Sequence, residues 1–414
     1  MKKVNVIGLG YIGLPTALMF AAHGVEVIGT DYNKELVDTL KHGHTTFDEK
    51  GLNELFEEAT KKNIEFTTEY TENNDIYIVS VPTPYEKENK KIDAKYVVSA
   101  VETILSVCKK GTILVIESTI SPGTIDKYIR PIIQEKGFEI GKDIHLVHAP
   151  ERIIPGNMIY ELKHNSRTIG ADSKEIGEEV KALYASFCEG EIVVTDIKTA
   201  EMTKVVENTF RDINIAFANE LSRICREDGM DVYEIIRIAN KHPRVNILQP
   251  GPGVGGHCIS VDPWFLVGDY PEIVNVIKAA REVNDGQPRF ILNRIHEIMA
   301  ENNIEDMSKV GLYGLTYKDN VDDVRESPTL QMLEIMEKEN EKVKIFDPLI
   351  KKDIVKNQMH DFNDFINSID MIVILNGHNE IREKISQLKN KIIFDTKNIV
   401  NGNNVYKIWV VKKK

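Results

Sequence analysis

Short apolar runs alternate with amphipathic stretches over the first 197 residues. β-Branched and other apolar residues gather in runs that we predict to be strands: 4–7, 25–29, 76–81, 112–117, 144–147 and 192–195. The stretches between them, such as 14–23 and 34–40, carry apolar residues at helical spacing. Alternation of this kind is typical of a parallel sheet covered by helices on both faces.

The pattern changes at about residue 198. Residues 198–228 contain no glycine or proline, and their apolar side chains recur at helical spacing. We expect one helix of about 45 Å there, at about 1.5 Å per residue. A helix of this length usually spans between domains or packs against a partner chain. Alternation of strands and helices resumes after about residue 305, with strands predicted at 309–313, 343–346, 371–375 and 392–395.

The first predicted strand leads into a glycine-rich turn. Gly8, Gly10 and Gly13 form the pattern GxGxxG, and a helical stretch follows at once. The first glycine of this pattern makes the tight turn, the second lets the backbone approach a pyrophosphate, and the third lets helix and strand pack closely. Asp31 ends the next strand, where a carboxylate can accept the adenosine ribose hydroxyls and repels a 2′-phosphate. The combination predicts an NAD site, the alternative being an ordinary turn with a solvated aspartate.

Polar residues follow three further predicted strands. Residues 81–84 and 118–124 come after strands, and ligands of open α/β sheets bind beyond the carboxyl ends of strands. Loops rich in proline can also merely turn the chain, and the sequence leaves both readings open. Glu151 follows another strand, where it is placed to act as a general base.

A second candidate centre lies around Cys258. Glycines and a proline fill residues 251–256 just before it, and glycines permit close approaches that side chains forbid. A cysteine presented from such a loop can be a nucleophile. Cys108, Cys188 and Cys225 lie in helical or apolar settings and are expected to be small buried side chains.

The long predicted helix carries a polar face. Lys204, Asn208 and Arg211 are spaced i, i+4 and i+7 and share one side of it. A lysine and an amide one turn apart can hold a developing oxyanion or a water molecule. A solvated polar stripe is the simpler alternative.

The composition of the chain limits the kinds of partner that it is expected to bind. The net charge of −12 argues against nucleic acid, so an anionic ligand would depend on local cations, such as those at 241–246 and at Lys318 and Arg325. No apolar stretch reaches the roughly 18 residues of a membrane span, and no signal peptide is expected. The four cysteines have no metal-ligand spacing, so we expect no metal and reduced thiols in a cytoplasmic protein.

Seven segments together resemble the UDP-glucose/GDP-mannose dehydrogenase family along nearly the whole chain. They are GLGYIGLP (8–15), VPTP (81–84), ESTISPGT (117–124), APER (149–152), 201–221, GPGVGGHCISVDP (251–263) and GLTYKDNVDDVRESP (314–328). The resemblance implies an α/β fold in three parts: an N-terminal Rossmann domain (1–197), a central helical dimerisation domain with one long helix (198–304), and a C-terminal Rossmann-like domain that binds the UDP sugar (305–414). Residues 244–250, 261–266 and 280–285 most resemble the members that act on UDP-N-acetyl-D-mannosamine.

The resemblance also implies a reaction and roles. The C6 hydroxymethyl of a nucleotide sugar is oxidised to a carboxylate with two NAD, through a thiohemiacetal and a thioester on Cys258. The implied catalytic residues are Cys258, Lys204, Asn208, Asp262, Glu151 and Thr119. Those implied to bind NAD are Gly8, Gly10, Tyr11, Ile12, Gly13, Asp31, Thr83, Thr119 and Arg325, and those implied to bind the UDP sugar are Arg152, Lys204, Asn208, Arg211, His242, Arg244, Gly255, Tyr317 and Lys318. Arg244 is implied to serve a neighbouring subunit, since these enzymes are homodimers or higher homo-oligomers.

Other readings stay open at this point. One alternative is that the enzyme performs the same chemistry on UDP-N-acetylglucosamine or UDP-glucose. A dehydrogenase that stops after one hydride, such as a β-hydroxyacid enzyme, would need no cysteine. A non-catalytic NAD-binding redox sensor would use Cys258 differently, but it leaves the polar helix face and the third region without a task.

Overall fold

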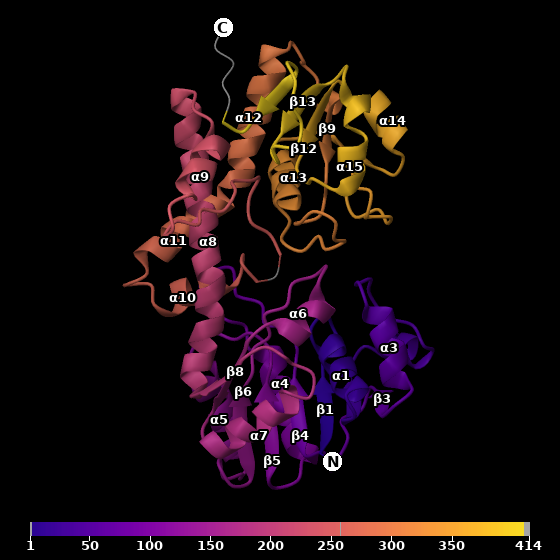
Figure 1. The fold of residues 1–414 in the computed structure, drawn as a ribbon, viewed down its shortest axis with the longest axis vertical. Coiled ribbons are helices and arrows are strands. Elements are labelled where there is room, and N and C mark those ends of the chain that lie inside the picture. Colours follow the sequence, from indigo (N-terminus) through magenta and orange to yellow (C-terminus); the bar gives the residue numbers. More distant parts are fainter. Residues whose placement is uncertain (1, 257, 410–414) are drawn as a thin grey trace. The chain divides into compact units, whose positions relative to one another are not determined.

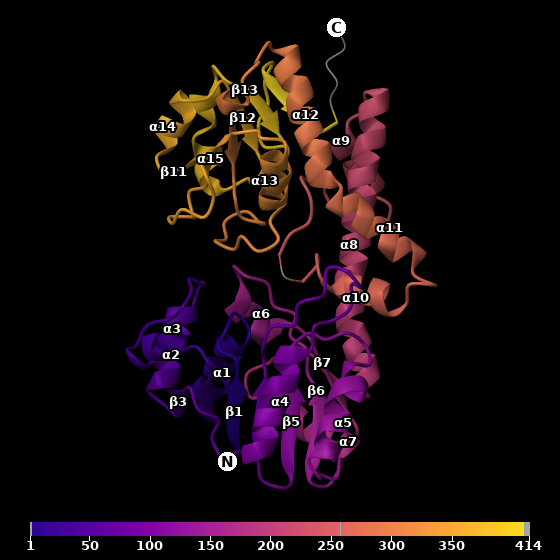
Figure 2. The ribbon, with the colours of Figure 1, turned by 180° about the vertical axis from the view of Figure 1, so that it is seen from behind.

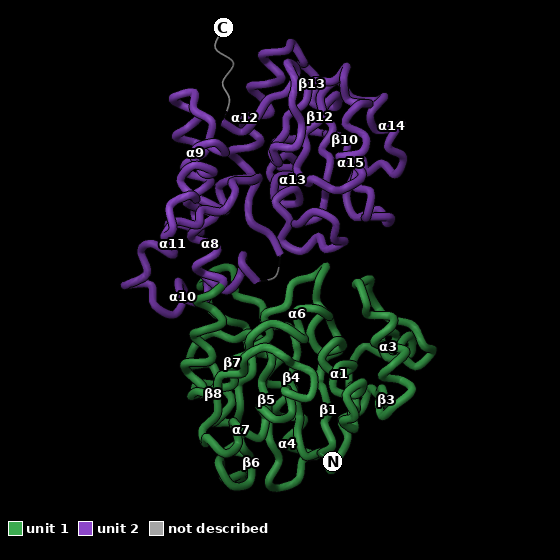
Figure 3. The backbone as a smooth tube through the Cα atoms, in the orientation of Figure 1, with its two compact units in different colours: residues 1–207 green, residues 208–414 purple. Residues whose placement is uncertain are grey.

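The computed structural model describes residues 2–256 and 258–409 and separates into two compact units (Figure 3). The first comprises residues 1–207 and the second residues 208–414. The division falls inside helix α8 (Ile197–Asp228), which is the single long helix that the sequence predicts. The central helical region and the C-terminal sheet therefore belong to one compact unit, and each unit is described by itself below.

The first unit is built on an eight-stranded sheet in the order β3-β2-β1-β4-β5-β6-β7-β8 (Figure 1). Its strands are β1 (Lys3–Ile7), β2 (Glu26–Thr30), β3 (Ile64–Thr67), β4 (Ile76–Val79), β5 (Thr112–Ile116), β6 (Ile144–His148), β7 (Arg167–Ala171) and β8 (Ile192–Thr195). The first six in this order are parallel and follow the 3-2-1-4-5-6 order of dinucleotide-binding sheets. All six strands predicted in this region are present, and β3 and β7 are additional.

The prediction of a wholly parallel sheet is wrong at one edge. β7 pairs antiparallel with β6, and β8 pairs parallel with β7. The connection from β6 to β7 contains only α6 (Met158–His164), a helix of 7 residues. β7 starts at the end of the sheet where β6 finishes and runs back beside it, with Gly170 opposite His148.

Helices of the first unit pack on this sheet. They are α1 (Gly13–Ala22), α2 (Lys34–Lys41), α3 (Leu52–Thr60), α4 (Lys95–Val107), α5 (Arg130–Glu135), α6 and α7 (Lys174–Tyr184), with a π-helical turn at Ile125–Ile129 before α5. Every residue of α1 is buried, since its sequence GLPTALMFAA has no charged side chain to face water. α1 contacts β1, β2 and β3 and belongs to the hydrophobic core of this unit.

The second unit joins helices to a six-stranded sheet (Figure 2). After α8 come α9 (Val232–Ala239), α10 (Asp262–Asp269), α11 (Asn275–Asp285) and α12 (Gln287–Glu301). The sheet has the order β11-β10-β9-β12-β13-β14, with all pairs parallel. Its elements are β9 (Val310–Tyr313), α13 (Pro328–Lys338), β10 (Lys344–Phe346), β11 (Gln358–Met359), α14 (Phe362–Asn367), β12 (Met371–Ile374), α15 (Asn379–Glu383), β13 (Ile392–Asp395) and β14 (Val405–Lys407). The four predicted strands are confirmed; β11 and β14, at the two edges of the sheet, are additional.

The same kind of turn follows β1 in the first sheet and β9 in the second. Gly8 follows β1 with φ +91° and Gly314 follows β9 with φ +106°, a region that favours glycine. The next backbone N–H in each case donates to the acid that ends the second strand: Leu9 to Asp31 over 2.8 Å and Leu315 to Asp347 over 2.6 Å. The helix after the turn begins at different distances, because α1 starts at Gly13 whereas α13 starts only at Pro328. Only the first sheet therefore presents a helix N-terminus directly behind its turn.

Within the described residues, no helix is both long and apolar enough to cross a membrane.

Candidate active site

The three glycines of the first turn have three different surroundings. A Cβ on Gly8 would lie 2.3 Å from the Ser80 backbone oxygen, and one on Gly13 would lie 1.9 Å from the Gly8 oxygen. A Cβ on Gly10 would meet no heavy atom within 4 Å. Gly8 and Gly13 are therefore required by the fold itself. Gly10 leaves open space in front of the helix N-terminus, as a site for a pyrophosphate requires.

Asp31 is held against this turn. Its carboxylate is 8% exposed and accepts the Leu9 N–H on Oδ2 and the Asn33 N–H on Oδ1, both over 2.8 Å. Because each carboxylate oxygen has two acceptor sites, these bonds leave acceptor capacity for a hydroxyl. Asp31 thus fixes the glycine turn in addition to the role that the sequence predicts.

Alanine substitutions separate the roles of two of these glycines. Gly13→Ala is expected to lower the thermal stability, because a backbone oxygen 1.9 Å away has nowhere to move. Gly10→Ala is expected to fold with unchanged stability and to weaken NAD binding about tenfold or more, since its methyl occupies the open space. Calorimetry and NAD titration on both variants check this. Equal effects of the two changes on NAD binding, with the fold intact in both, would contradict it.

The ends of β4 and β5 are tied together. Ser118 accepts the Val81 N–H and donates to the Val81 carbonyl, each over 2.8 Å, and the Thr83 hydroxyl donates to the Thr119 carbonyl over 2.6 Å. The two loops that the sequence left open as ligand loops or plain turns thus form one braced edge beside the glycine turn. Tyr11 and Ile12, also predicted to bind NAD, are half-buried there, with the Tyr11 ring 4.4 Å from that of Phe47.

Glu151, the predicted base, belongs to a buried charge cluster. Its carboxylate pairs with Arg167 and accepts the N–H groups of Arg152 and Ile153. Arg167 also lies 3.9 Å from Glu117, which accepts the hydroxyl of Tyr184 over 3.0 Å. Burial raises the pKa of Glu117 to about 7, against the pull of Arg167. These contacts favour a positioning role for Glu151 over direct proton transfer, and they add Glu117 and Arg167, which the sequence did not single out.

Lys204 lies in the first half of α8 and is 4% exposed. Burial lowers the pKa of His148 to about 3, and the nearby positive charge of Lys204 acts in the same direction. His148 is therefore neutral and donates through Nδ1 to the Ile116 carbonyl over 2.8 Å. One turn before Lys204, Glu201 accepts the Gly123 N–H over 2.6 Å and the Ile125 N–H over 3.1 Å, which fastens α8 to the loop that carries Thr119.

The second half of α8 lies in the second unit and carries Asn208. Its amide donates to the Asp262 carboxylate over 2.6 Å, and the Asp262 N–H donates to the Cys258 carbonyl over 2.9 Å. Asn208 and Asp262 are 7% and 2% exposed, whereas Cys258 is exposed. The structure thus brings together three of the predicted catalytic residues: a buried amide–carboxylate pair adjoins the backbone of Cys258, which is exposed.

Tyr317 packs against two glycines of the segment 251–259 that carries Cys258, which we call the cysteine loop. A Cβ on Gly255 would lie 2.7 Å from Tyr317 Cβ, and one on Gly256 would lie 3.0 Å from its ring. The Gly256 N–H donates to the Arg325 carbonyl over 2.9 Å. Burial raises the pKa of Tyr317, and the negative charges of Asp323 and of a Cys258 thiolate add to the shift. Tyr317 and Gly255, both predicted to bind the sugar, therefore lie close to Cys258.

The predicted cationic residues divide into two groups. Arg152 pairs with Glu207, and Arg325 pairs with Asp323. Arg211, His242, Arg244 and Lys318 are exposed, as is the paired Arg325. Their exposure suits binding to an anionic ligand, and their roles remain predictions.

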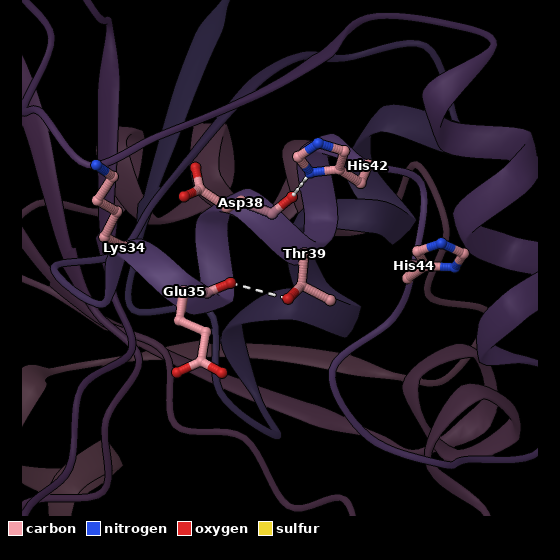
Figure 4. A pocket seen from close by; sticks show the side chains of 6 residues that line it. All are labelled: Lys34, Glu35, Asp38, Thr39, His42 and His44. Carbon is pink, nitrogen blue, oxygen red and sulfur yellow. Dashed lines mark hydrogen bonds between the residues drawn. The ribbon is translucent and has the colours of Figure 1, made fainter.

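A surface hollow at α2 is lined by other residues than those of the candidate site (Figure 4). Its lining residues are Lys34, Glu35, Asp38, Thr39, His42 and His44, none of which is a predicted site residue. Thr39 donates to the Glu35 carbonyl over 2.8 Å and His42 to the Asp38 carbonyl over 2.6 Å, so these polar groups serve the helix itself.

The fold and these two centres define a dinucleotide-dependent oxidoreductase with a separate nucleotide-binding domain. Three domains of the UDP-glucose/GDP-mannose dehydrogenase family match the chain: the NAD binding domain at residues 2–188, the central domain at 198–286 and the UDP binding domain at 311–402. The chain therefore belongs to this family, and the predicted family, enzyme class and cofactor, NAD, are confirmed.

Individual relatives match this chain over nearly their whole length. A UDP-N-acetyl-D-mannosamine dehydrogenase from Methanococcus vannielii is 46% identical, with 97% of this chain and 94% of the relative covered. A structure of the UDP-N-acetyl-mannosamine dehydrogenase from Staphylococcus aureus is 41% identical, covers 98% of each chain and has a TM-score of 0.88. An NDP-N-acetyl-D-galactosaminuronic acid dehydrogenase from Ralstonia nicotianae is 38% identical, with 98% of this chain and 97% of the relative covered.

Proposed function

We propose that this enzyme oxidises UDP-N-acetyl-D-mannosamine at C6 to UDP-N-acetyl-D-mannosaminuronate with two NAD. The observation that carries the proposal is the exposed Cys258 thiol next to the buried Asn208–Asp262 pair, in a chain of this family. The activities for which the relatives from M. vannielii and S. aureus are named support the choice of sugar.

The residues at the glycine turn suit NAD. Gly10 leaves room for a pyrophosphate, the α1 N-terminus lies behind it, and Asp31 supplies acceptors for ribose hydroxyls and a charge that opposes a 2′-phosphate. Bound there, NAD supplies the hydride acceptor in both oxidations. Thr83 and Thr119 brace this edge, and Tyr11, Ile12 and Arg325 complete the proposed set of contacts.

The chain's own residues carry the rest of the chemistry. The Cys258 sulfur adds to the C6 aldehyde to form a thiohemiacetal, which the second oxidation converts to a thioester. Water then cleaves the thioester, and the released carboxylate carries the added oxygen. The positive charge of Lys204 stabilises the alkoxide and oxyanion states. Asn208 orients water, Asp262 orients it or accepts its proton, and Glu151 holds its loop through Arg167.

The remaining proposed residues hold the UDP sugar. Cations suit its diphosphate, and the glycine and tyrosine beside Cys258 suit its sugar ring. The set is Arg152, Lys204, Asn208, Arg211, His242, Arg244, Gly255, Tyr317 and Lys318. We propose the domain boundaries 1–197, 198–304 and 305–414 for the NAD, central and UDP-sugar domains.

An exposed apolar stripe on α8 supports a homodimer. Phe210, Phe217 and Ile224 recur every seven residues and are 66%, 54% and 50% exposed. Apolar side chains at this spacing form one helix face, which a second copy would cover. The proposal includes no nucleic acid or membrane partner. It places the enzyme in the cytoplasm, a setting with which four reduced cysteines agree.

The stoichiometry of NADH tests this function. We expect two NADH per UDP-N-acetyl-D-mannosamine and little from UDP-glucose, UDP-N-acetylglucosamine or GDP-mannose. Two NADH from another sugar would retain the mechanism and overturn the substrate. One NADH from every sugar would refute the thioester route, and none from any would favour the redox-sensor alternative.

A further inference from the structure

A buried chain of side chains joins α8 to α11 in the second unit. Its members are Asp212 and Asn219 on α8, Arg281 and Asn284 on α11, and Gln287 at the start of α12, all at most 1% exposed. Residues 280–285 were part of the sequence resemblance, yet the reaction outlined above gives Arg281 and Asn284 no task.

The hydrogen bonds of this chain converge on the carboxylate of Asp212. Asn219 donates to the Asn284 side-chain oxygen over 2.9 Å, and Asn284 donates to the Asp212 carboxylate over 2.8 Å. Arg281 donates to the same carboxylate over 2.5 Å. Burial raises the pKa of Asp212, and the positive charge of Arg281 opposes the shift.

Both ends of the network lie on the main chain around Cys258. At one end the Gly251 N–H donates to Asn219 over 2.9 Å, and Gln287 donates to the Gly251 carbonyl over 3.1 Å. At the other end Arg281 donates to the Ile259 carbonyl over 3.5 Å. A network that merely packed α8 against α11 would have no need of these backbone groups. The two contacts lie eight residues apart, on either side of the glycines that make this segment pliable.

We propose that Asn219, Asn284 and Arg281 are positioning residues that hold both ends of the cysteine loop, so that Cys258 meets the C6 aldehyde at a fixed place. The inference rests on the proposed function of Cys258. It explains why buried polar groups occupy this part of the unit, where apolar side chains would pack at lower cost. A displacement of about 1 Å in a reacting group can reduce a rate about 100-fold, so the loop anchors matter to rate more than to binding.

The test uses Arg281→Lys and Asn284→Ala in the full-length enzyme. Arg281→Lys keeps the charge beside Asp212 but loses the planar guanidinium, whose Nη1 donates to both Asp212 and the Ile259 carbonyl and whose Nη2 pairs with Asp285. Arg294→Lys is the matched control, because Arg294 is a 1% exposed arginine on α12 paired with Glu297 and Glu301. Gln287→Glu acts at the Gly251 end alone: it keeps the acceptor for Arg223 and replaces the amide that donates to the Gly251 carbonyl and to Asn219.

We expect kcat to fall about 10- to 100-fold in Arg281→Lys and Asn284→Ala, with the KM for NAD within about threefold. Deuterium uptake in peptides covering residues 247–266 should become about tenfold faster, and in Gln287→Glu the change should be confined to the Gly251 end. The control should show neither effect. Unchanged loop exchange with a kcat loss that merely follows lower stability would overturn the proposal. If Cys258→Ala still forms carboxylate, the proposed function fails, whereas the exchange data judge the loop anchors independently.

Discussion

Cys258→Ala is expected to abolish formation of the uronate while NAD binding survives. The thiol is the group that retains the aldehyde as a thiohemiacetal, so its loss should lower the rate of carboxylate formation about 10⁴-fold or more. All the proposed NAD-binding residues except Arg325 belong to the other compact unit, so the dissociation constant for NAD should stay within about twofold. Product analysis by mass spectrometry and NAD titration measure the two effects.

Cys108→Ala is the matched control for this change. Cys108 follows α4 in the first unit, and burial raises the pKa of its thiol, so it lacks the exposed setting of Cys258. Its removal should leave carboxylate formation unchanged. Full activity of Cys258→Ala, or an equal loss in Cys108→Ala, would remove the thioester from the mechanism.

Asp31→Ala is expected to raise the KM for NAD about 10- to 100-fold and to weaken the preference over NADP. The substitution removes both the acceptor for ribose hydroxyls and the anchor of the Leu9 N–H, and hydrogen bonds to a charged group are worth about 1.5–3 kcal/mol. Steady-state kinetics with both cofactors provide the measurement.

Two further variants separate charge from geometry at this position. Asp31→Asn keeps an oxygen for Leu9 but loses the charge that repels a 2′-phosphate, so it should relax the NADP discrimination with a smaller loss for NAD. Asp347→Asn changes the matching acid of the second sheet and should leave the KM for NAD unaltered. If Asp31→Ala left both cofactors unaffected, Asp31 would not belong to the NAD site.

Several features of this enzyme could be predicted from residues that are close together in the sequence. The turn at Gly8, the acid at Asp31 and the long helix 197–228 each follow from residues close together in the chain, and the structure has all three. The pairing of Asn208 with Asp262 could be expected only as a shared role, because 54 residues separate them. The strands that the sequence did not predict are β3, β11 and β14, at edges of the two sheets, and β7, beside the edge strand β8.

By itself the sequence determined the elements, the family, the cofactor and the candidate nucleophile, since periodicity, turn chemistry and motifs are written in neighbouring residues. The tertiary structure alone decided which groups meet: Glu151 with Arg167, Glu201 with the loop at Gly123, and Arg281 with Asp212. It also decided that β7 runs antiparallel beside β6. A buried charge must find its partner in space, at a distance along the chain that no local pattern encodes.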